Sequence, residues 1–332
     1  MRLMKVRILI LLITFCFVGE LQAQELIKPL HGNWKFSLGD DMEWASADFD
    51  DSLWDNIYAP SAWENEGFNG YDGYAWYRRV VNGDQLKDYY NLQLNLGYID
   101  DSDQVFFNGV LIGYSGTFPP NFNTAYNAKR AYHIPNELIR DGENVIAIRV
   151  YDTVLGGGII SGEIGIYTAS DIGFPALTLE GLWKFREGDE AAWKNPGYDD
   201  EEWPFLMAPG YWRNIGKKNF ESFGWYRKEF MMPSWLNGKG LTLILGVIDD
   251  FDEVYLNGQF IGRTNDGERW GHSESYRQLR IYPIPEGLIN ESGKNTLAVR
   301  ITDLGGEAGI YKGPLMILDS QDAAVFVRDF LR

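Results

Sequence analysis

Two short acidic runs carry the side chains best suited to hold a metal ion. The runs begin at Asp100 and Asp249, and their members are Asp100, Asp101, Asp103, Asp249, Asp250 and Asp252. Clustered carboxylates suit calcium, but neither run has the glycine that a calcium loop needs for its sharp turn. Strand alternation also predicts that neighbouring side chains point to opposite faces. We therefore expect no cofactor, and keep structural calcium as an alternative with the candidates Asp100, Asp103, Asp249 and Asp252.

Arginines and two further aspartates stand near these runs. The arginines are natural counter-ions for the acidic runs, as the pairs Arg78 and Arg227, Arg130 and Arg280, and Arg149 and Arg300. Asp152 and Asp303 follow expected strands and precede glycine-rich loops. Charged groups of this kind complement the hydroxyl rim of a sugar. Arg130, Asp152, Arg280 and Asp303 are therefore candidate ligand contacts.

Aromatic side chains in loops provide the apolar half of such a site. Phe122 and Trp270 lie in two long loops that also carry many hydrogen-bonding side chains, and Trp63 and Trp212 follow prolines in glycine-rich loops. A pyranose ring has an apolar face that stacks on a flat aromatic ring. These four residues are candidate ligand contacts, with burial as the alternative, above all for Trp63, Trp212 and Trp270.

Catalytic patterns are not found in the sequence. Its three histidines are His31, His133 and His272, and no Gly-x-Ser-x-Gly motif accompanies them. Glycoside hydrolysis needs two carboxylates flanking the sugar, but with 47 acidic residues such pairs arise by chance. Cys16 is the only cysteine, which excludes a disulfide within the chain. We expect a protein that is not an enzyme.

The elements that must position these residues occur twice. Gly32-Asn33-Trp34-Lys35-Phe36 returns as Gly181-Leu182-Trp183-Lys184-Phe185, and ten of the twelve tryptophans recur at an offset of 149 residues. A period of this length is a whole domain rather than a solenoid repeat. The tryptophans on apolar, strand-like patterns, such as Trp34, Trp54 and Trp76, are expected in the core.

Strand and turn signals dominate both halves. Residues 92–96 alternate apolar and polar, and Asn108-Gly109 and Asn257-Gly258 separate pairs of apolar runs, as in type I′ hairpins. These patterns predict an all-β fold of two tandem antiparallel β-sandwiches. We expect domains at 24–172 and 173–320, and a tail at 321–332 that is a docking strand or a frayed end.

Several motifs resemble known carbohydrate-processing proteins. Residues 49–63 resemble the N-terminal sugar-binding domain of glycoside hydrolase family 2 in the order Phe-Asp-Asp, Trp, Ile, Pro, Trp. The Asn-Gly hairpin of residues 105–113 resembles the same domain. Residues 99–103 and Gly157-Gly158-Ile159 are similar to the sandwich inserted into sialate O-acetylesterases. The resemblance implies galactose-binding-like jelly rolls without catalytic residues. Ser61-Ala62 and Gly210-Tyr211 stand where the family has His-Asp, so contacts made by that pair do not carry over.

The net charge and the N-terminal residues limit the class of partner and the cellular location. The net charge of −17 opposes binding to nucleic acid or to anionic membranes. A basic start, an apolar run that is too short to span a bilayer, and Leu21-Gln22-Ala23 predict a cleaved signal peptide at 1–23. We expect a secreted or periplasmic protein that is not membrane-spanning.

Three functions fit the sequence. The first is a non-catalytic, carbohydrate-binding accessory module that binds a glycan or oligosaccharide, alone or beside a glycosidase or esterase. The second is a hydrolase of O-glycosyl compounds or carbohydrate esters with a site between the two domains. The third is a structural or adhesion module that binds a protein, since sandwiches of this type serve both roles.

Overall fold

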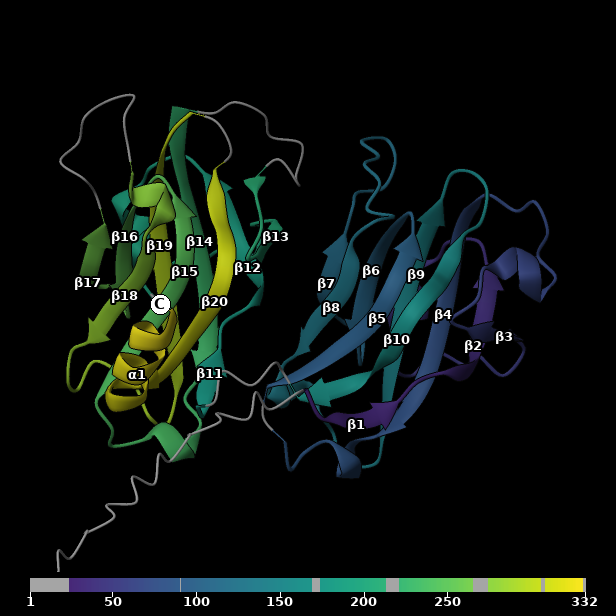
Figure 1. The fold of residues 1–332 in the computed structure, drawn as a ribbon, viewed down its shortest axis with the longest axis horizontal. Coiled ribbons are helices and arrows are strands. Elements are labelled where there is room, and N and C mark those ends of the chain that lie inside the picture. The colour runs from purple at the N-terminus through teal and green to yellow at the C-terminus, as the bar shows by residue number, and fades with distance from the viewer. Residues whose placement is uncertain are drawn as a thin grey trace, which may run out of the picture.

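The computed structural model describes residues 24–89, 91–168, 174–212, 221–264, 274–305 and 308–330. These residues form two β-sandwiches, each with a four-stranded and a six-stranded antiparallel sheet (Figure 1). The prediction of an all-β fold with two antiparallel sandwiches is confirmed. The predicted signal peptide, Cys16, Trp270 and His272 lie outside the described residues.

The first sandwich pairs a sheet of order β1-β10-β5-β8 with a sheet of order β3-β2-β4-β9-β6-β7. Its strands are β1 (Leu26–Pro29), β2 (Gly32–Leu38), β3 (Asp55–Ala59), β4 (Gly73–Asn82), β5 (Leu92–Asp100), β6 (Ser102–Phe107), β7 (Val110–Ser115), β8 (Lys129–Ile134), β9 (Glu143–Asp152) and β10 (Gly158–Thr168). In the six-stranded sheet β9 lies between β4 and β6, with Tyr151 opposite both Tyr74 and Ser102.

The second sandwich has the same arrangement, with orders β11-β20-β15-β18 and β13-β12-β14-β19-β16-β17. Its strands are β11 (Ala176–Thr178), β12 (Gly181–Glu187), β13 (Phe205–Ala208), β14 (Glu221–Met231), β15 (Leu241–Asp249), β16 (Phe251–Leu256), β17 (Gln259–Thr264), β18 (Leu279–Ile284), β19 (Lys294–Leu304) and β20 (Gly309–Asp319). Each strand thus has a counterpart in the first sandwich.

The predicted hairpins form as expected. Asn108 and Gly109 have φ angles of 50° and 82°, and Asn257 and Gly258 have 49° and 80°. Two successive positive φ angles define the type I′ turn, whose twist matches that of the strands. The turns therefore fix the registers of β6 with β7 and of β16 with β17.

The tryptophans divide between two apolar regions in each sandwich. Trp34 and Trp63 lie in the core between the two sheets. Trp76 is also buried, but in a smaller cluster with Trp44 and Trp54, which are partly buried. Core packing of Trp34 and Trp76 is confirmed, and each sandwich gains a second apolar cluster outside its main core.

The C-terminal tail is a helix, which corrects the expectation of a docking strand or frayed end. Helix α1 (Ser320–Phe330) begins where the Asp319 carboxylate accepts a hydrogen bond from the Gln321 amide, at 2.8 Å. Ala323 is buried against the outer face of β15 and β20 (Figure 1). The run of Ala323, Phe326 and Val327 has the spacing of one helical face, a signal that the sequence did contain.

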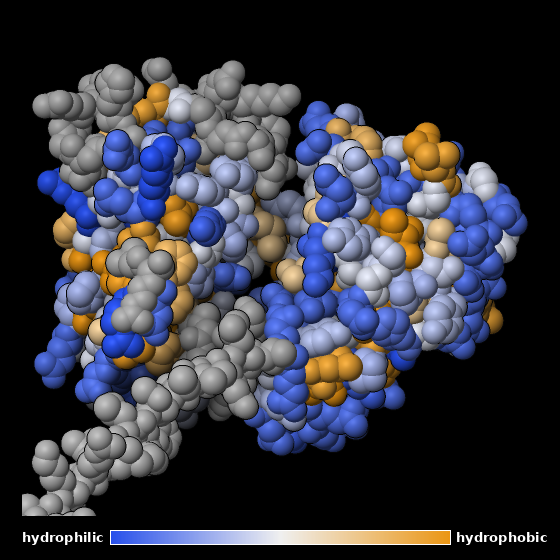
Figure 2. Space-filling model, viewed as in Figure 1, coloured by the Kyte–Doolittle hydropathy of each residue, from blue (hydrophilic) through white to orange (hydrophobic). Residues whose placement is uncertain are grey.

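The two sandwiches contact each other directly. Asn91 accepts a hydrogen bond from the Thr178 amide at 3.2 Å and donates one to the Ala176 carbonyl. The Tyr114 hydroxyl donates to the Phe205 carbonyl at 3.2 Å. On the face shown in Figure 2, hydrophobic residues form separate groups in a mainly hydrophilic surface. Among the described residues no helix is long and apolar enough to cross a membrane.

Candidate functional site

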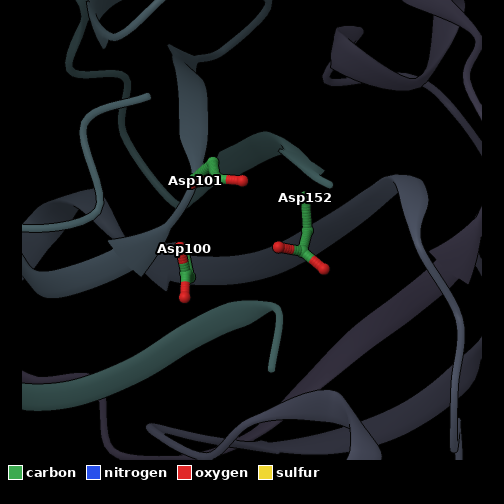
Figure 3. Close-up of side chains that lie close together, drawn as sticks. All are labelled: Asp100, Asp101 and Asp152. Carbon is green, nitrogen blue, oxygen red and sulfur yellow. The ribbon is translucent and has the colours of Figure 1, made fainter. Parts of the chain in front are cut away.

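Three aspartates from neighbouring strand ends meet in the first sandwich. Asp100 ends β5, Asp101 lies between β5 and β6, and Asp152 ends β9. One carboxylate oxygen from each lies within 4.8 Å of the others (Figure 3). We call Asp100, Asp101 and Asp152 the acidic cluster. The Asp100–Asp101 peptide bond is cis, and the two carboxyl groups share the cluster rather than opposite faces, which corrects the alternation argument.

Hydrogen bonds hold Asp101 in place. Its Oδ1 accepts a bond from the Thr124 hydroxyl, and its Oδ2 accepts bonds from the hydroxyl and the amide of Thr153, at 2.7 and 3.2 Å. Burial raises the pKa of Asp101, but these bonds outweigh it and leave the pKa below its usual value. Asp101 is therefore the ionised, oriented member of the acidic cluster.

Asp152 differs from Asp101 in its hydrogen bonding and in its pKa. Its side chain is 0% exposed, and neither carboxylate oxygen has a hydrogen-bond partner within the described part of the chain. Burial, followed by the charges of Asp100 and Asp101, raises the pKa of Asp152 to about 7. Burial and the neighbouring Asp101 carboxyl also raise the pKa of Asp100 to about 6. The cluster thus brings three carboxyl groups together where each one's charge disfavours ionisation of the others.

The second sandwich contains the corresponding cluster. Asp249, Asp250 and Asp303 also place one carboxylate oxygen each within 4.8 Å of the others. Asp250 accepts a hydrogen bond from the Leu304 amide at 2.9 Å. Burial and the charge of Asp250 raise the pKa of Asp249 to about 7. Asp152 and Asp303, predicted as sugar contacts, are buried in these clusters, so an ion fits them better than a sugar does.

The third aspartate of each run is not part of a cluster, which corrects the choice of Asp103 and Asp252 as metal candidates. Asp103 bonds to Arg130 Nε at 2.7 Å and accepts a bond from the Tyr132 hydroxyl at 2.5 Å. Asp252 and Arg280 form the same pair at 2.6 Å. An arginine thus neutralises each of these buried carboxylates, as the counter-ion hypothesis proposed.

Arg130 and Arg280 are correspondingly unavailable as ligand contacts, and that prediction is corrected. Both side chains are fully buried, and Arg130 also donates to the carbonyls of Ala125 and Asp101, at 2.5 and 2.9 Å. A guanidinium that is fully buried and bonded to protein acceptors is out of reach of a sugar hydroxyl. The role of Arg130 is to fix the backbone around the acidic cluster.

Trp63 and Trp212 are buried too, which corrects their assignment as ligand contacts. The Trp63 indole N–H donates to the Tyr71 carbonyl at 3.1 Å, and the Trp212 indole N–H donates to the Tyr226 hydroxyl at 2.8 Å. Both rings pack inside the sandwiches. The burial alternative holds for these two positions.

Half-exposed aromatic side chains gather on the outer face of the six-stranded sheet of the first sandwich. We call Tyr74, Phe118, Phe122 and Tyr151 the aromatic patch. Phe122 is 36% exposed and stands edge-on to Tyr151, with 5.5 Å between ring centroids. Tyr151 in turn lies 4.6 Å from Tyr74. Of these four rings, only Phe122 had been predicted as a ligand contact.

A charged pair supports the aromatic patch from one side. The Arg149 guanidinium contacts the rings of Tyr74 and Phe118, at 4.7 and 4.4 Å from their centroids, and the two rings stack on each other with 5.7 Å between centroids. Arg149 Nε donates to Asp40 Oδ1 at 2.7 Å. Because Tyr74 and Phe118 stack on each other and Tyr151 contacts both, the exposed Phe122 ring is the most open part of the aromatic patch.

Within its described residues, the second sandwich keeps the charged pair but not the patch. Arg300 bonds to Asp189 at 2.7 Å and lies 4.3 Å from the Phe223 ring centroid. Thr302 stands where the first sandwich has Tyr151. Trp270, predicted as an exposed platform here, lies outside the described residues. The Tyr74–Tyr151 ring pair of the first sandwich is thus replaced by Phe223 and Thr302 in the second.

A pocket of about 270 Å³ lies between the sandwiches, lined by residues that include His133, Glu137 and Lys228. Two of its acids are in ion pairs, Asp200 with Arg227 at 2.6 Å and Glu229 with Lys294 at 2.7 Å. Burial, followed by the charge of Lys228, lowers the pKa of His133 to about 3. The pocket keeps this imidazole neutral at neutral pH.

The neutral His133 makes the stability of the protein sensitive to acid. Its pKa is lower in the folded state than in the unfolded chain, so between about pH 6.5 and 3 the unfolded chain binds more protons. The contribution of His133 is therefore lost as the pH falls through that window. We expect His133→Gln to reduce the loss of stability between pH 7 and 4.5 by about 2 kcal/mol.

Thermal melts at several pH values test this expectation. His31→Gln is the matched control, because His31 lies at the surface 3.9 Å from Glu163. The control should follow the unchanged protein, whereas His133→Gln should melt several degrees higher than either at pH 4.5. Equal slopes for all three proteins would contradict the role of His133.

Comparisons with solved structures return carbohydrate-active enzymes at low identity. A Bacteroides uniformis beta-glucuronidase is 15% identical, with 87% of this chain and 27% of that chain covered and a TM-score of 0.37. A Bacteroides vulgatus beta-glycosidase is 17% identical, with 83% and 29% covered and a TM-score of 0.36. A glycosyl hydrolase family 2 member from Bacteroides cellulosilyticus is 13% identical, with 83% and 31% covered and a TM-score of 0.37. This chain spans less than a third of each.

No curated protein sequence matches the chain. A family model does match, and it is described as the second all-beta domain of beta-galactosidase. The match covers residues 188–307, which run from the end of β12 to the loop before β20. The resemblance to sandwich domains of glycoside hydrolases is thereby confirmed for the second sandwich, which is similar to the second all-beta domain of beta-galactosidases.

Proposed function

We propose that this protein binds glycans through the aromatic patch of its first sandwich, as a non-catalytic accessory module of glycan degradation. The observation that carries the proposal is the half-exposed Phe122 ring beside Tyr151. The apolar face of a pyranose stacks on such a ring, while its hydroxyls need hydrogen-bonding partners nearby. Arg149 and Asp40 supply charged groups at the edge of the same patch.

The loop that carries Phe122 is built to hold the ring in place. Thr117 and Asn123 exchange two backbone hydrogen bonds, of 2.9 and 3.2 Å, across the base of residues 117–123. The ring is therefore partly ordered before a ligand arrives. Pre-ordering reduces the entropy that binding must overcome, which favours recognition of a flat, weakly interacting ligand such as a sugar.

The overall charge favours neutral ligands. With a net charge of −17, the protein repels polyanions such as nucleic acids, whereas an uncharged oligosaccharide meets no such barrier. The family match of residues 188–307 to a beta-galactosidase domain supports the same class of ligand. A secreted or periplasmic location, through cleavage of residues 1–23, belongs to the same proposal.

The hydrolase alternative has less support from the interdomain pocket. Retaining and inverting glycosidases need two carboxyl groups that are free to act on the sugar. Of the acids that line this pocket within the described residues, Asp200 and Glu229 are each bonded to a basic side chain. We therefore expect chromogenic glycosides and acetyl esters to react at the buffer rate. Saturable hydrolysis that is lost in Glu137→Gln would support the hydrolase instead.

Replacing Phe122 tests the proposed binding surface. We expect Phe122→Ala to weaken glycan binding about 3- to 10-fold, because one aromatic contact contributes about 0.5–1.5 kcal/mol. A glycan array identifies the ligand, and calorimetry with that ligand measures the change. The melting temperature should stay within a few degrees, because the ring is not part of a core.

Phe260→Ala is the matched control for this variant. Phe260 is 52% exposed on β17 of the second sandwich, far in sequence from the aromatic patch. It should bind the glycan as the unchanged protein does. Equal binding by Phe122→Ala and the unchanged protein would remove the patch as the binding surface.

A further inference from the structure

The acidic cluster has a feature that clusters of surface acids lack. The Asp152 carboxylate is fully buried, it points toward Asp100 and Asp101, and within the described residues neither of its oxygens accepts a hydrogen bond (Figure 3). A buried carboxylate without partners is costly, because water no longer solvates it and nothing replaces the water. Its position therefore calls for a positively charged partner at the centre of the cluster.

Among the described residues, no side chain supplies that partner. The nearest guanidinium, that of Arg130, bonds to Asp103 and to backbone carbonyls, including that of Asp101. Arg130 therefore bonds to a backbone carbonyl of the cluster and not to its three carboxylates. These carboxylates need another positive charge. We propose that Asp100, Asp101 and Asp152 bind a divalent cation of the size of calcium.

The donor set and its dimensions select this class of ion. Three carboxylates offer only hard oxygen ligands, which suit Ca²⁺ or Mg²⁺ rather than zinc or copper. Oxygens on opposite sides of Ca²⁺ are about 5 Å apart, twice a Ca–O distance of about 2.3–2.6 Å, and those around Mg²⁺ about 4 Å. The oxygens of the cluster lie within 4.8 Å of one another, so one oxygen from each of the three carboxylates can contact a single Ca²⁺ ion.

The surroundings provide orientation and access. Hydrogen bonds from Thr124 and Thr153 fix the orientation of the Asp101 carboxylate, as outer-shell groups do for metal ligands. Asp100 is only partly buried, so an ion and its remaining waters can enter from that side. The Ala125 amide also donates to the Asp101 carbonyl at 3.0 Å. The ion therefore fastens the base of the loop that carries Phe122.

The second sandwich repeats the site. Asp249, Asp250 and Asp303 also place one carboxylate oxygen each within 4.8 Å of the others, at the same position in the strand order as the first cluster. Asp249 is the partly buried member, as Asp100 is. The chain therefore binds two cations, one in each sandwich.

Calcium titration of the full chain tests the proposal. Calorimetry should show two Ca²⁺ ions per chain with dissociation constants of about 10⁻⁵–10⁻³ M, and Mg²⁺ should bind at least tenfold more weakly. Terbium is a second probe. A Cβ on Gly157 would lie 2.2 Å from the Trp63 ring and 2.8 Å from Asp152 Cβ, so Trp63 is close enough to sensitise Tb³⁺ bound at the cluster. Added Ca²⁺ should displace the bound Tb³⁺ and so remove the luminescence.

Variants assign each ion to its cluster. Asp152→Asn should lose one of the two ions and the Trp63-sensitised signal, and Asp303→Asn should lose the other ion. Asp55→Asn removes an exposed charge on β3 and should keep both. If Asp152→Asn does not fold, as judged by circular dichroism, Asp100→Asn replaces it with the same expectation, because Asp100 is partly exposed.

The proposal fails on either of two results. One is the absence of binding heat and of terbium luminescence at millimolar ion, which would mean that the carboxyl groups share protons instead. The other is binding of both ions by the Asp152→Asn, Asp303→Asn double variant, which would place them elsewhere.

Discussion

Replacing Arg130 with methionine is expected to destabilise the first sandwich by about 3–5 kcal/mol. Arg130 and Asp103 are both fully buried and joined by a 2.7 Å hydrogen bond, so the substitution leaves the Asp103 carboxylate buried without its counter-ion. It also removes the hydrogen bonds that Arg130 donates to the Ala125 and Ala128 carbonyls. Chemical denaturation at neutral pH, followed by tryptophan fluorescence, measures the loss of stability.

A double variant separates charge from packing. Arg130→Met combined with Asp103→Asn removes the unpaired charge, and we expect it to recover a large part of the lost stability. The Arg280→Met variant makes the same change to the Asp252–Arg280 pair of the second sandwich and should cost as much. A loss below 1 kcal/mol in both single variants would show that water reaches Asp103 and Asp252.

Local signals in the sequence were sufficient for the fold. Asn-Gly at residues 108–109 and 257–258 set the hairpin turns, because few other pairs adopt two positive φ angles at low cost. Alternation in residues 92–96 placed strand β5. Such features depend on a few neighbouring residues, which is why they can be read without a structure. The C-terminal helix was not predicted, although Ala323, Phe326 and Val327 have the spacing of one helical face.

The candidate site depends on contacts distant in sequence and was only partly predicted. Asp100 and Asp152 were both singled out, but for different ligands, and nothing in the sequence showed that the ends of β5 and β9 adjoin. Asp103 was grouped with Asp100 because they are close in sequence. In the structure Asp103 instead forms an ion pair with Arg130, the counter-ion that the sequence did suggest.

The aromatic patch shows the same limit. Phe122 was chosen because it lies in a long loop with polar neighbours, which is a local signal. Tyr74 and Tyr151 were missed, although they stand opposite each other on β4 and β9. Cross-strand neighbours of this kind could have been found from a correct strand pairing.

Replacing Trp63 with alanine should cost about 3–5 kcal/mol of stability, as the deletion of a fully buried aromatic ring does. Trp63 is 0% exposed, and its ring fills the space beside Gly157 and Gly158, where added Cβ atoms would lie 2.2 and 3.3 Å from it. Its indole N–H also bonds to the Tyr71 carbonyl, which would lose its donor. Thermal melts should therefore show a decrease of about 10 °C.

Glycan binding by the same variant distinguishes a core residue from a ligand platform. Because the Trp63 ring lies between the sheets and the aromatic patch lies on the outer face of one of them, binding measured well below the melting temperature should change by less than about twofold. Trp212→Ala is the matched variant in the second sandwich, with 3% exposure and an indole bonded to Tyr226, and should show the same stability loss. If Trp63→Ala instead melts normally and loses the glycan, the ring reaches the ligand, and the binding surface lies beside the acidic cluster rather than at Phe122.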